Sequence, residues 1–158
     1  MRLNDLAEAP VTEATTFKLK AQLLEQGRTD EEILRTDNLW ARLKVYASGG
    51  ENVLHAHPIE DHMFLILQGR ATFYDKEGQA TELGKYEGIL LPAMTYYWFC
   101  ATGDEPLVLF RLGARAGEPP KDFGAGVTRV DVTGAPIHGE SEANKEVPVI
   151  FRDGAYFG

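Results

Sequence analysis

Short apolar runs separated by turn-forming residues dominate the middle of the chain. Between residues 39 and 113 the runs are rich in β-branched and aromatic side chains, and the breaks between them are rich in Gly, Pro, Asp and Glu. Such runs are typical of strands, and such breaks are typical of turns. The runs read NLWARLKVYA, HMFLILQ, RATFYD, QATEL, EGILLP, TYYWFC and EPLVLFRL. At least seven strands without an intervening helical period predict an all-β fold, an antiparallel sandwich or barrel.

Two of these runs alternate regularly enough to predict which side chains share a face. In residues 39–46, Leu, Ala, Leu and Val alternate with Trp, Arg, Lys and Tyr, so one face should be buried and the other partly wet. In TYYWF, Tyr97 and Phe99 should point into the core, whereas Tyr96 and Trp98 should point outward. The outward pair needs a covering surface, either another subunit or the N-terminal strand, and we therefore expect a homodimer.

The ends of the chain predict fewer elements. FKLKAQLL (17–24) alternates with a period of two and favours a strand, whereas Thr29 and Glu32 in TDEEILR have capping-box spacing and predict a short N-terminal helix ending near Asn38. VPVIF (147–151) is a candidate for the last strand. We expect one domain with three parts: an arm over residues 1–37 that packs on the barrel or on a partner subunit, a barrel core over 38–113, and a C-terminal loop and strand over 114–158.

Composition narrows the class of protein. The 158 residues, 17.5 kDa, suffice for one compact core, and a net charge of −8 without a basic run argues against nucleic-acid binding. The chain has a single cysteine, Cys100, lacks the apolar core of a signal peptide at its start, and has no apolar run approaching the ~20 residues that span a bilayer. These features favour a soluble, cytoplasmic protein without a membrane partner.

Three of the four histidines lie in HAHPIEDH, residues 55–62. His55 and His57 project to the same side of an extended segment, Pro58 interrupts regular pairing, and His62 opens the next strand, which returns alongside the first. Three neutral imidazoles on one face can hold a divalent transition metal, such as Fe(II), Zn, Ni or Mn, and leave positions open for water or substrate. The alternative is an exposed hairpin, or core histidines that only form hydrogen bonds.

SGGENVLHAHPIEDHMFLILQG resembles the first motif of the cupin superfamily, in which Gly49, His55, His57 and Gly69 match and His62 stands where the metal-binding glutamate is usual. LLPAMTYYWFCAT is similar to the second motif, with Pro92 matching, Met94 in place of glycine and Tyr97 in place of the last histidine. The resemblance covers about residues 38–113. It implies a small antiparallel β-barrel of two packed sheets (a double-stranded β-helix, or jelly roll), a metal inside its mouth, and commonly a dimer.

The resemblance implies His55, His57 and His62 as metal ligands. Tyr97 would bind the metal as a phenolate, donate a hydrogen bond to a metal-bound oxygen, or merely fill the core; we favour the donor and treat it as the catalytic candidate. Without the glutamate the ion would keep its full charge and attract a small chelating dicarbonyl, enolate or phenolic ligand. Residues of lower weight are His138 as a loop residue, Cys100 as a small buried side chain, Glu60 and Asp61 as groups that orient an imidazole, and Gln68 and Arg111 as polar contacts inside the barrel.

Three functions remain open at this point. The first is a metal-dependent enzyme of dioxygenase or isomerase type. The second is a non-catalytic barrel that binds or senses a small molecule, because the second motif has lost its usual last ligand. The third is a metal-free structural barrel that acts through its dimer or partner surface.

Overall fold

The computed structural model describes residues 9–118, 128–137 and 147–158. Within these ranges the regular elements are all strands. In chain order they are β1 (Ala21–Gln26), β2 (Arg28–Arg35), β3 (Leu39–Tyr46), β4 (Glu60–Gln68), β5 (Ala71–Tyr74), β6 (Ala80–Leu83), β7 (Gly88–Leu91), β8 (Trp98–Ala101), β9 (Leu107–Arg115) and β10 (Ile150–Phe157). The predicted all-β class is therefore confirmed. No helix long and apolar enough to cross a membrane occurs in the described ranges.

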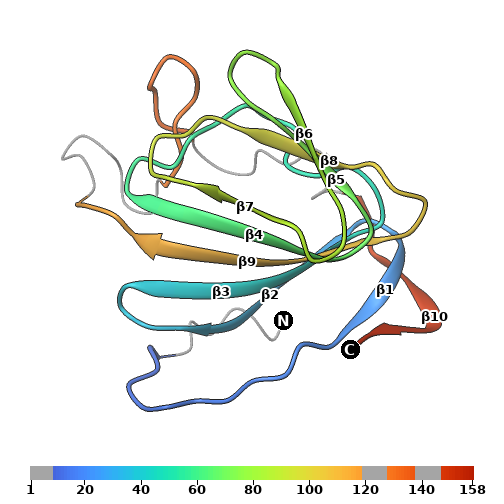
Figure 1. The fold of residues 1–158 in the computed structure, drawn as a ribbon. Coiled ribbons are helices and arrows are strands. Elements are labelled where there is room, and N and C mark those ends of the chain that lie inside the picture. Colours follow the sequence, from blue (N-terminus) through green and yellow to red (C-terminus); the bar gives the residue numbers. More distant parts are fainter. Residues whose placement is uncertain (1–8, 119–127, 138–146) are drawn as a thin grey trace.

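The strands form three antiparallel sheets (Figure 1). The largest has the order β2-β3-β9-β4-β7, a second has the order β6-β5-β8, and β1 pairs with β10 in a third. No ladder of hydrogen bonds joins the five-stranded to the three-stranded sheet among the described strands. The two sheets therefore pack as a sandwich, and the predicted barrel is not closed by strand pairing.

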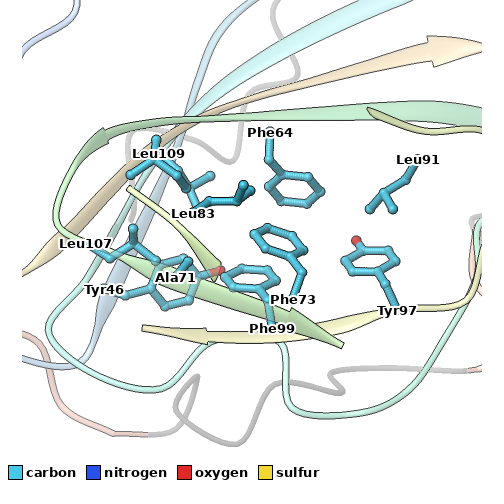
Figure 2. Close-up of a cluster of buried hydrophobic side chains, with 11 residues drawn as sticks. Tyr46, Phe64, Ala71, Phe73, Leu83, Leu91, Tyr97, Phe99, Leu107 and Leu109 are labelled. Atoms are coloured by element: carbon cyan, nitrogen blue, oxygen red, sulfur yellow. The ribbon is translucent and has the colours of Figure 1, made fainter. Parts of the chain in front are cut away.

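An aromatic core fills the space between the five-stranded and three-stranded sheets (Figure 2). Phe64 of β4 lies edge-on to Phe73 of β5 and to Phe99 of β8, with ring centroids 5.1 and 5.4 Å apart. Phe73 and Phe99 are stacked at 4.9 Å. Each such pair adds about 0.5–1.5 kcal/mol to the free energy gained by burying the rings. The prediction that Tyr97 and Phe99 point inward is confirmed, since both are buried in this core.

A second apolar cluster lies on the opposite face of the five-stranded sheet. Leu23 and Leu24 of β1 pack there with Leu43 and Val45 of β3 and with Val108 of β9. Both faces of β3 are consequently covered, and the expectation of a partly wet face is wrong for the inner half of this strand: Lys44 and Tyr46 are 1% and 0% exposed. The sequence pattern shows alternation, but it does not show that a further sheet covers the apolar side while the polar side faces a cavity.

The predicted short N-terminal helix is also wrong. The segment with capping-box spacing lies in strand β2, which pairs with β3 in a register that sets Asp30 opposite Lys44 and Glu32 opposite Arg42. Arg42 Nη1 lies 3.2 Å from Asp30 Oδ1, and Nη2 lies 3.8 Å from Glu32 Oε1. Opposite charges across a ladder stabilise strand pairing, so the tertiary partner outweighs the local helix signal.

The two predicted terminal strands are present with shifted bounds. Of the predicted strand 17–24, residues 21–24 are in β1, and of 147–151 only Ile150 and Phe151 are in β10. Leu24 and Phe151 are register partners where β1 and β10 pair. The ends of the chain therefore close on each other and cover the second apolar cluster.

Candidate metal centre

The three clustered histidines are brought together at one end of the sandwich. His55 pairs with Tyr97 through two backbone hydrogen bonds of 2.9 and 3.1 Å, which joins the segment before β4 to the start of β8. The His57 ring centroid lies 5.1 Å from that of His55 and 3.9 Å from that of His62 on β4. All three side chains are buried, with 1%, 7% and 2% exposure for His55, His57 and His62. The predicted convergence of the imidazoles is thus observed.

In the described residues, His57, Glu60 and His62 form a group that could hold a metal ion. One donor atom from each lies within 4.8 Å of the others. His57 Nδ1 and His62 Nε2 are buried and have no hydrogen-bond partner. Two imidazoles and a carboxylate suit a late first-row divalent ion, so the residues fit the kind of metal that the resemblance implies.

Gly113 makes room for this arrangement. It lies on β9 between its register partners Trp40 on β3 and His62 on β4. A Cβ atom at Gly113 would overlap the Trp40 indole. The indole therefore lies over the glycine and meets His62 edge-on at 5.2 Å, and its Nε1 donates a hydrogen bond of 2.5 Å to Glu60 Oε2. Trp40 thus fixes the carboxylate that stands beside His62.

His55 is held differently. Its Nδ1 lies 2.6 Å from the Val53 carbonyl oxygen, which can only accept, so Nδ1 carries a hydrogen. The other nitrogen, Nε2, lies 3.3 Å from Glu51 Oε2. His55 is therefore oriented by the Val53 carbonyl, with Nε2 beside the Glu51 carboxylate, and it lies outside the group formed by His57, Glu60 and His62. Its role as a ligand stays a prediction.

A buried arginine occupies the centre of the site. Arg111 on β9 is 6% exposed, and its Nη2 lies 2.8 Å from His62 Nδ1, 2.9 Å from the Tyr97 hydroxyl and 3.3 Å from His57 Nε2. Its Nη1 donates a hydrogen bond to Glu51. The guanidinium also lies 4.7 Å from the centroid of the Phe64 ring. The predicted polar contact of Arg111 inside the barrel is confirmed, and it links His57, His62 and Tyr97.

Glu51 is the acidic partner of this cation. The residue is 4% exposed, accepts a hydrogen bond of 2.9 Å from the Tyr97 hydroxyl, and lies 3.3 Å from Lys44 Nζ. Burial alone would raise the pKa of the Glu51 carboxyl, but Arg111 and Lys44 hold that pKa well below its ordinary value. A full negative charge therefore stands against two buried positive charges.

The pKa values of the other groups define their states. Burial lowers the pKa of both His57 and His62, and neighbouring positive charge adds to this, so both imidazoles are neutral at pH 7. Burial raises the pKa of Tyr97 well above its ordinary value, so its hydroxyl keeps its proton. Although burial alone would lower it, Glu51 raises the pKa of Arg111, which stays charged. The site therefore offers neutral imidazoles and one fixed cation.

A cavity of about 450 Å³ opens beside these groups. His57, Glu60, His62, Arg111 and Trp40 lie on its wall, with further acidic and basic side chains from β2 and β3. The volume is within the range of small-molecule sites. Tyr97 is not among the residues that line this cavity.

The second motif departs from the family pattern at Met94, but the backbone there has a conformation that glycine adopts readily. Met94, in place of the usual glycine, has a φ of 64°. This left-handed conformation is uncommon for a residue with a side chain. The Met94 amide donates a hydrogen bond of 2.8 Å to the His57 carbonyl, so the turn ties the second motif to the first.

The remaining sequence candidates lie around this centre with different roles. The Asp61 carboxylate accepts a hydrogen bond of 2.8 Å from the Ala93 amide, and Gln68 donates one of 3.2 Å to the Pro106 carbonyl. Cys100 is partly buried. His138 lies outside the described residues.

Sequence reasoning missed Glu51 and Lys44. Glu51 lies in a glycine-rich turn where acids are common, and Lys44 lies on the polar side of an alternating strand. Neither position carries a local signal for burial. The Glu51 to His55 spacing is the one hint in the sequence, and it has meaning only once the segment is folded over Arg111.

Comparisons with known proteins agree with the fold. Residues 42–112 match the family model described as a cupin domain. A conserved protein of unknown function from Streptococcus pyogenes superposes with a TM-score of 0.54 at 14% identity, covering 71% of this chain and 99% of the other. KdgF from Halomonas superposes with a TM-score of 0.51 at 19% identity, covering 65% of this chain and 96% of the other. The Cnp3 cupin domain of Schizosaccharomyces pombe superposes with a TM-score of 0.51 at 18% identity, covering 58% of this chain and 67% of the other.

These findings define the class of protein. Residues 42–112 belong to the cupin superfamily. At these identities the solved structures show the fold alone. No curated protein sequence matches the chain.

Proposed function

We propose that the chain is a metal-dependent cupin that acts on a small chelating dicarbonyl, enolate or phenolic molecule, as a dioxygenase or an isomerase. The observation that carries this proposal is the group formed by His57, Glu60 and His62 beside the cavity, in which His57 Nδ1 is buried without a hydrogen-bond partner and His62 Nε2 lies 3.7 Å from Glu60 Oε1. These three residues would hold the ion, with His55 as a neighbouring candidate ligand. When bound, a divalent transition metal supplies Lewis acidity toward the oxygens of a chelating ligand.

The protein's own groups would bind and orient that ligand. Arg111 lies on the cavity wall and keeps its charge, so it favours an anionic oxygen. Trp40 holds Glu60 and forms part of the wall. Tyr97 remains the proposed donor to the substrate: its hydroxyl now donates to Glu51 Oε2 behind the cavity wall, and it would have to leave this carboxylate to reach a substrate oxygen.

Counting metal per chain tests the metal site. Protein purified without a histidine tag should contain, or take up under anaerobic conditions, close to one divalent ion per chain by elemental analysis. The His57→Ala/His62→Ala double variant should lose that ion, whereas His138→Ala, which changes the fourth histidine of the sequence, should keep it. Metal uptake that is the same in the double variant would contradict the proposed ligands.

Turnover is tested separately. An Fe(II)-loaded sample should consume oxygen with a member of a diketone and catechol panel, or another metal-loaded sample should isomerise an α-hydroxy ketone. Silence across the panel with metal bound would favour the second candidate, a non-catalytic module that binds a small molecule. Two features support that candidate: Tyr97 stands where the family has its last histidine, and Arg111 already donates to His62.

A further inference from the structure

We propose that Arg111 is a resident cation that competes with a metal ion for His62. The inference rests on the proposed metal site, and it concerns a residue to which the family motifs assign no part. It follows from how the guanidinium is placed and from the number of lone pairs on a neutral imidazole.

The Nη2 atom of Arg111 is surrounded by three residues that stand at ligand positions of the two family motifs. These are His57, His62 in place of the glutamate and Tyr97 in place of the last histidine, at 3.3, 2.8 and 2.9 Å. All three side chains contact this one nitrogen and share its two hydrogens, much as ligands gather around an ion. The guanidinium therefore takes up the interactions that three of the four ligand positions have to offer.

The hydrogen bond to His62 fixes the tautomer of that imidazole. Arginine has only donors, so His62 Nδ1 must accept, and the hydrogen of the neutral ring must lie on Nε2. His62 Nε2 lies 3.7 Å from Glu60 Oε1, the side on which a hydrogen is favoured. A neutral imidazole has one lone pair, and here Arg111 receives it.

A metal ion cannot share that lone pair. If an ion binds Nδ1, it displaces the guanidinium directly. If it binds Nε2 instead, the hydrogen moves to Nδ1 and points at the donor Nη2, which breaks the same hydrogen bond. Whichever nitrogen of His62 an ion uses, the contact between Arg111 and His62 is lost.

Charge opposes the ion as well. Arg111 is buried among aromatic rings, 4.7 Å from the Phe64 centroid and 5.6 Å from the Trp40 centroid, where water screens charge weakly. Glu51 neutralises one positive charge, but Lys44 adds a second at 3.3 Å from the same carboxylate. Asp30 lies 3.7 Å from the same lysine, so the positive charge in direct contact with His62 is that of Arg111. A divalent ion at His62 therefore meets a like charge at close range unless Arg111 moves away.

Titration of Co(II) into matched variants tests the competition, with affinity measured by calorimetry and histidine ligation followed by visible absorption. Arg111→Met removes the charge and the donors at similar length, and it should bind Co(II) about tenfold or more tightly than the wild type. Arg111→Lys keeps the charge and should stay weak. Arg115→Met changes an exposed arginine on the same strand and should match the wild type.

The Arg111→Met/Glu51→Gln double variant guards against a folding failure, because it removes both members of the buried ion pair. It too should bind Co(II) more tightly than the wild type. Equal affinity in wild type, Arg111→Met and the double variant would overturn the competition and leave the proposed metal site intact. Binding by the Arg111 variants but not by the wild type would support the competition and contradict a metal-dependent function.

A measurement without metal tests the contact between Arg111 and His62 independently of metal affinity and of the proposed function. Long-range ¹H–¹⁵N correlation spectra of the imidazoles should show His62 as the neutral tautomer with hydrogen on Nε2 in the wild type. The Arg111→Met variant should lose this restriction. A wild-type spectrum with hydrogen on His62 Nδ1 would overturn the proposal.

Discussion

Gly113 is a single position that controls the shape of the site. Because it has no side chain, Trp40 can lie across β9 between its neighbours and reach Glu60. Glycine in a strand interior is otherwise unfavourable, and here it marks a close approach by another side chain. The glycine lowers the local strand propensity of β9, but it allows the Trp40 indole to take this position.

Gly113→Ala should therefore displace Trp40. We expect the free energy of unfolding to fall by about 1–3 kcal/mol, because the added methyl group meets a packed ring. Denaturant unfolding measures the stability, and the indole N–H resonance of Trp40 should shift as its hydrogen bond to Glu60 is lost. Gly117→Ala, at a position with open space around it, is the control. An unchanged indole resonance in Gly113→Ala would contradict this role.

Glu51 holds the buried charges of the site together, although the sequence around it gives no sign that it is buried. Its carboxylate joins Arg111, Lys44 and Tyr97, and it is the acid that lets two cations lie inside the sandwich. Removing one member of a buried pair leaves an uncompensated charge, which costs far more than the pair gains. Burial of the charges therefore depends on all members being present together.

At the scale of elements, the pairing of β2 with β3 replaces a predicted helix. The ladder places Asp30 and Glu32 opposite Lys44 and Arg42. Asp30 Oδ2 lies 3.7 Å from Lys44 Nζ, which is buried. The strand thus brings acidic side chains next to the basic side chains of β3 on the cavity side.

Asp30→Asn should weaken this pairing in a pH-dependent way. Burial alone would raise the pKa of Asp30, but Lys44 and Arg42 lower it below its ordinary value of 3.8. A lowered folded-state pKa contributes stability that is full above about pH 4 and is lost as pH falls through the folded-state value. The stability difference between wild type and Asp30→Asn should therefore be largest near neutral pH and shrink below about pH 4.

Denaturant unfolding across about pH 2.5–7 measures this difference, because the range extends to both sides of the ordinary Asp pKa of about 4. Asp104→Asn, at an exposed loop position, should show no comparable trend. An Asp30→Asn difference that is constant over the whole range would mean that the ion pairs of β2 do not stabilise the fold.

At the scale of the whole molecule, three stacked sheets separate two apolar layers. One layer lies between the five-stranded and three-stranded sheets, and the other lies under β1 and β10 (Figure 1). The polar cavity opens from the first layer, where the apolar core gives way to His57, His62 and Arg111. The site is thus built where the sandwich is open.

The homodimer stays a prediction at this scale. The outward aromatic pair that suggested it is partly covered within the chain: Trp98 stacks on Tyr74 at 4.1 Å, and the Tyr96 hydroxyl donates to the Asp131 carbonyl. Strand β10 instead exposes Phe151 and Tyr156 at 52% and 54%. Exposed apolar side chains on a strand favour association with a second copy. Light scattering at micromolar concentration should show a dimer, and a monomer of 17.5 kDa would contradict it.

The sequence by itself determined the class of fold and the convergence of the three clustered histidines. Alternating runs and turn residues indicated the strands of both central sheets except β2, because local patterning decides which side chains can share a face. The spacing of His55, His57 and His62 placed the imidazoles together, because residues two apart point the same way and a tight turn returns the chain. The inward position of Tyr97 followed from the same periodicity.

Only the tertiary structure decided what those residues face. It turned the capping-box segment into β2, because an ion-paired strand partner outweighs a local helix preference. It buried the inner half of the polar side of β3, because Tyr46 packs on Phe99 and Lys44 pairs with Glu51 there, while β1 and β10 cover the apolar side. It also brought Glu51 and Arg111, 60 positions apart, to the ligand positions. Long-range contacts of this kind leave no periodic trace, so the cation among the histidines became visible only in the folded chain.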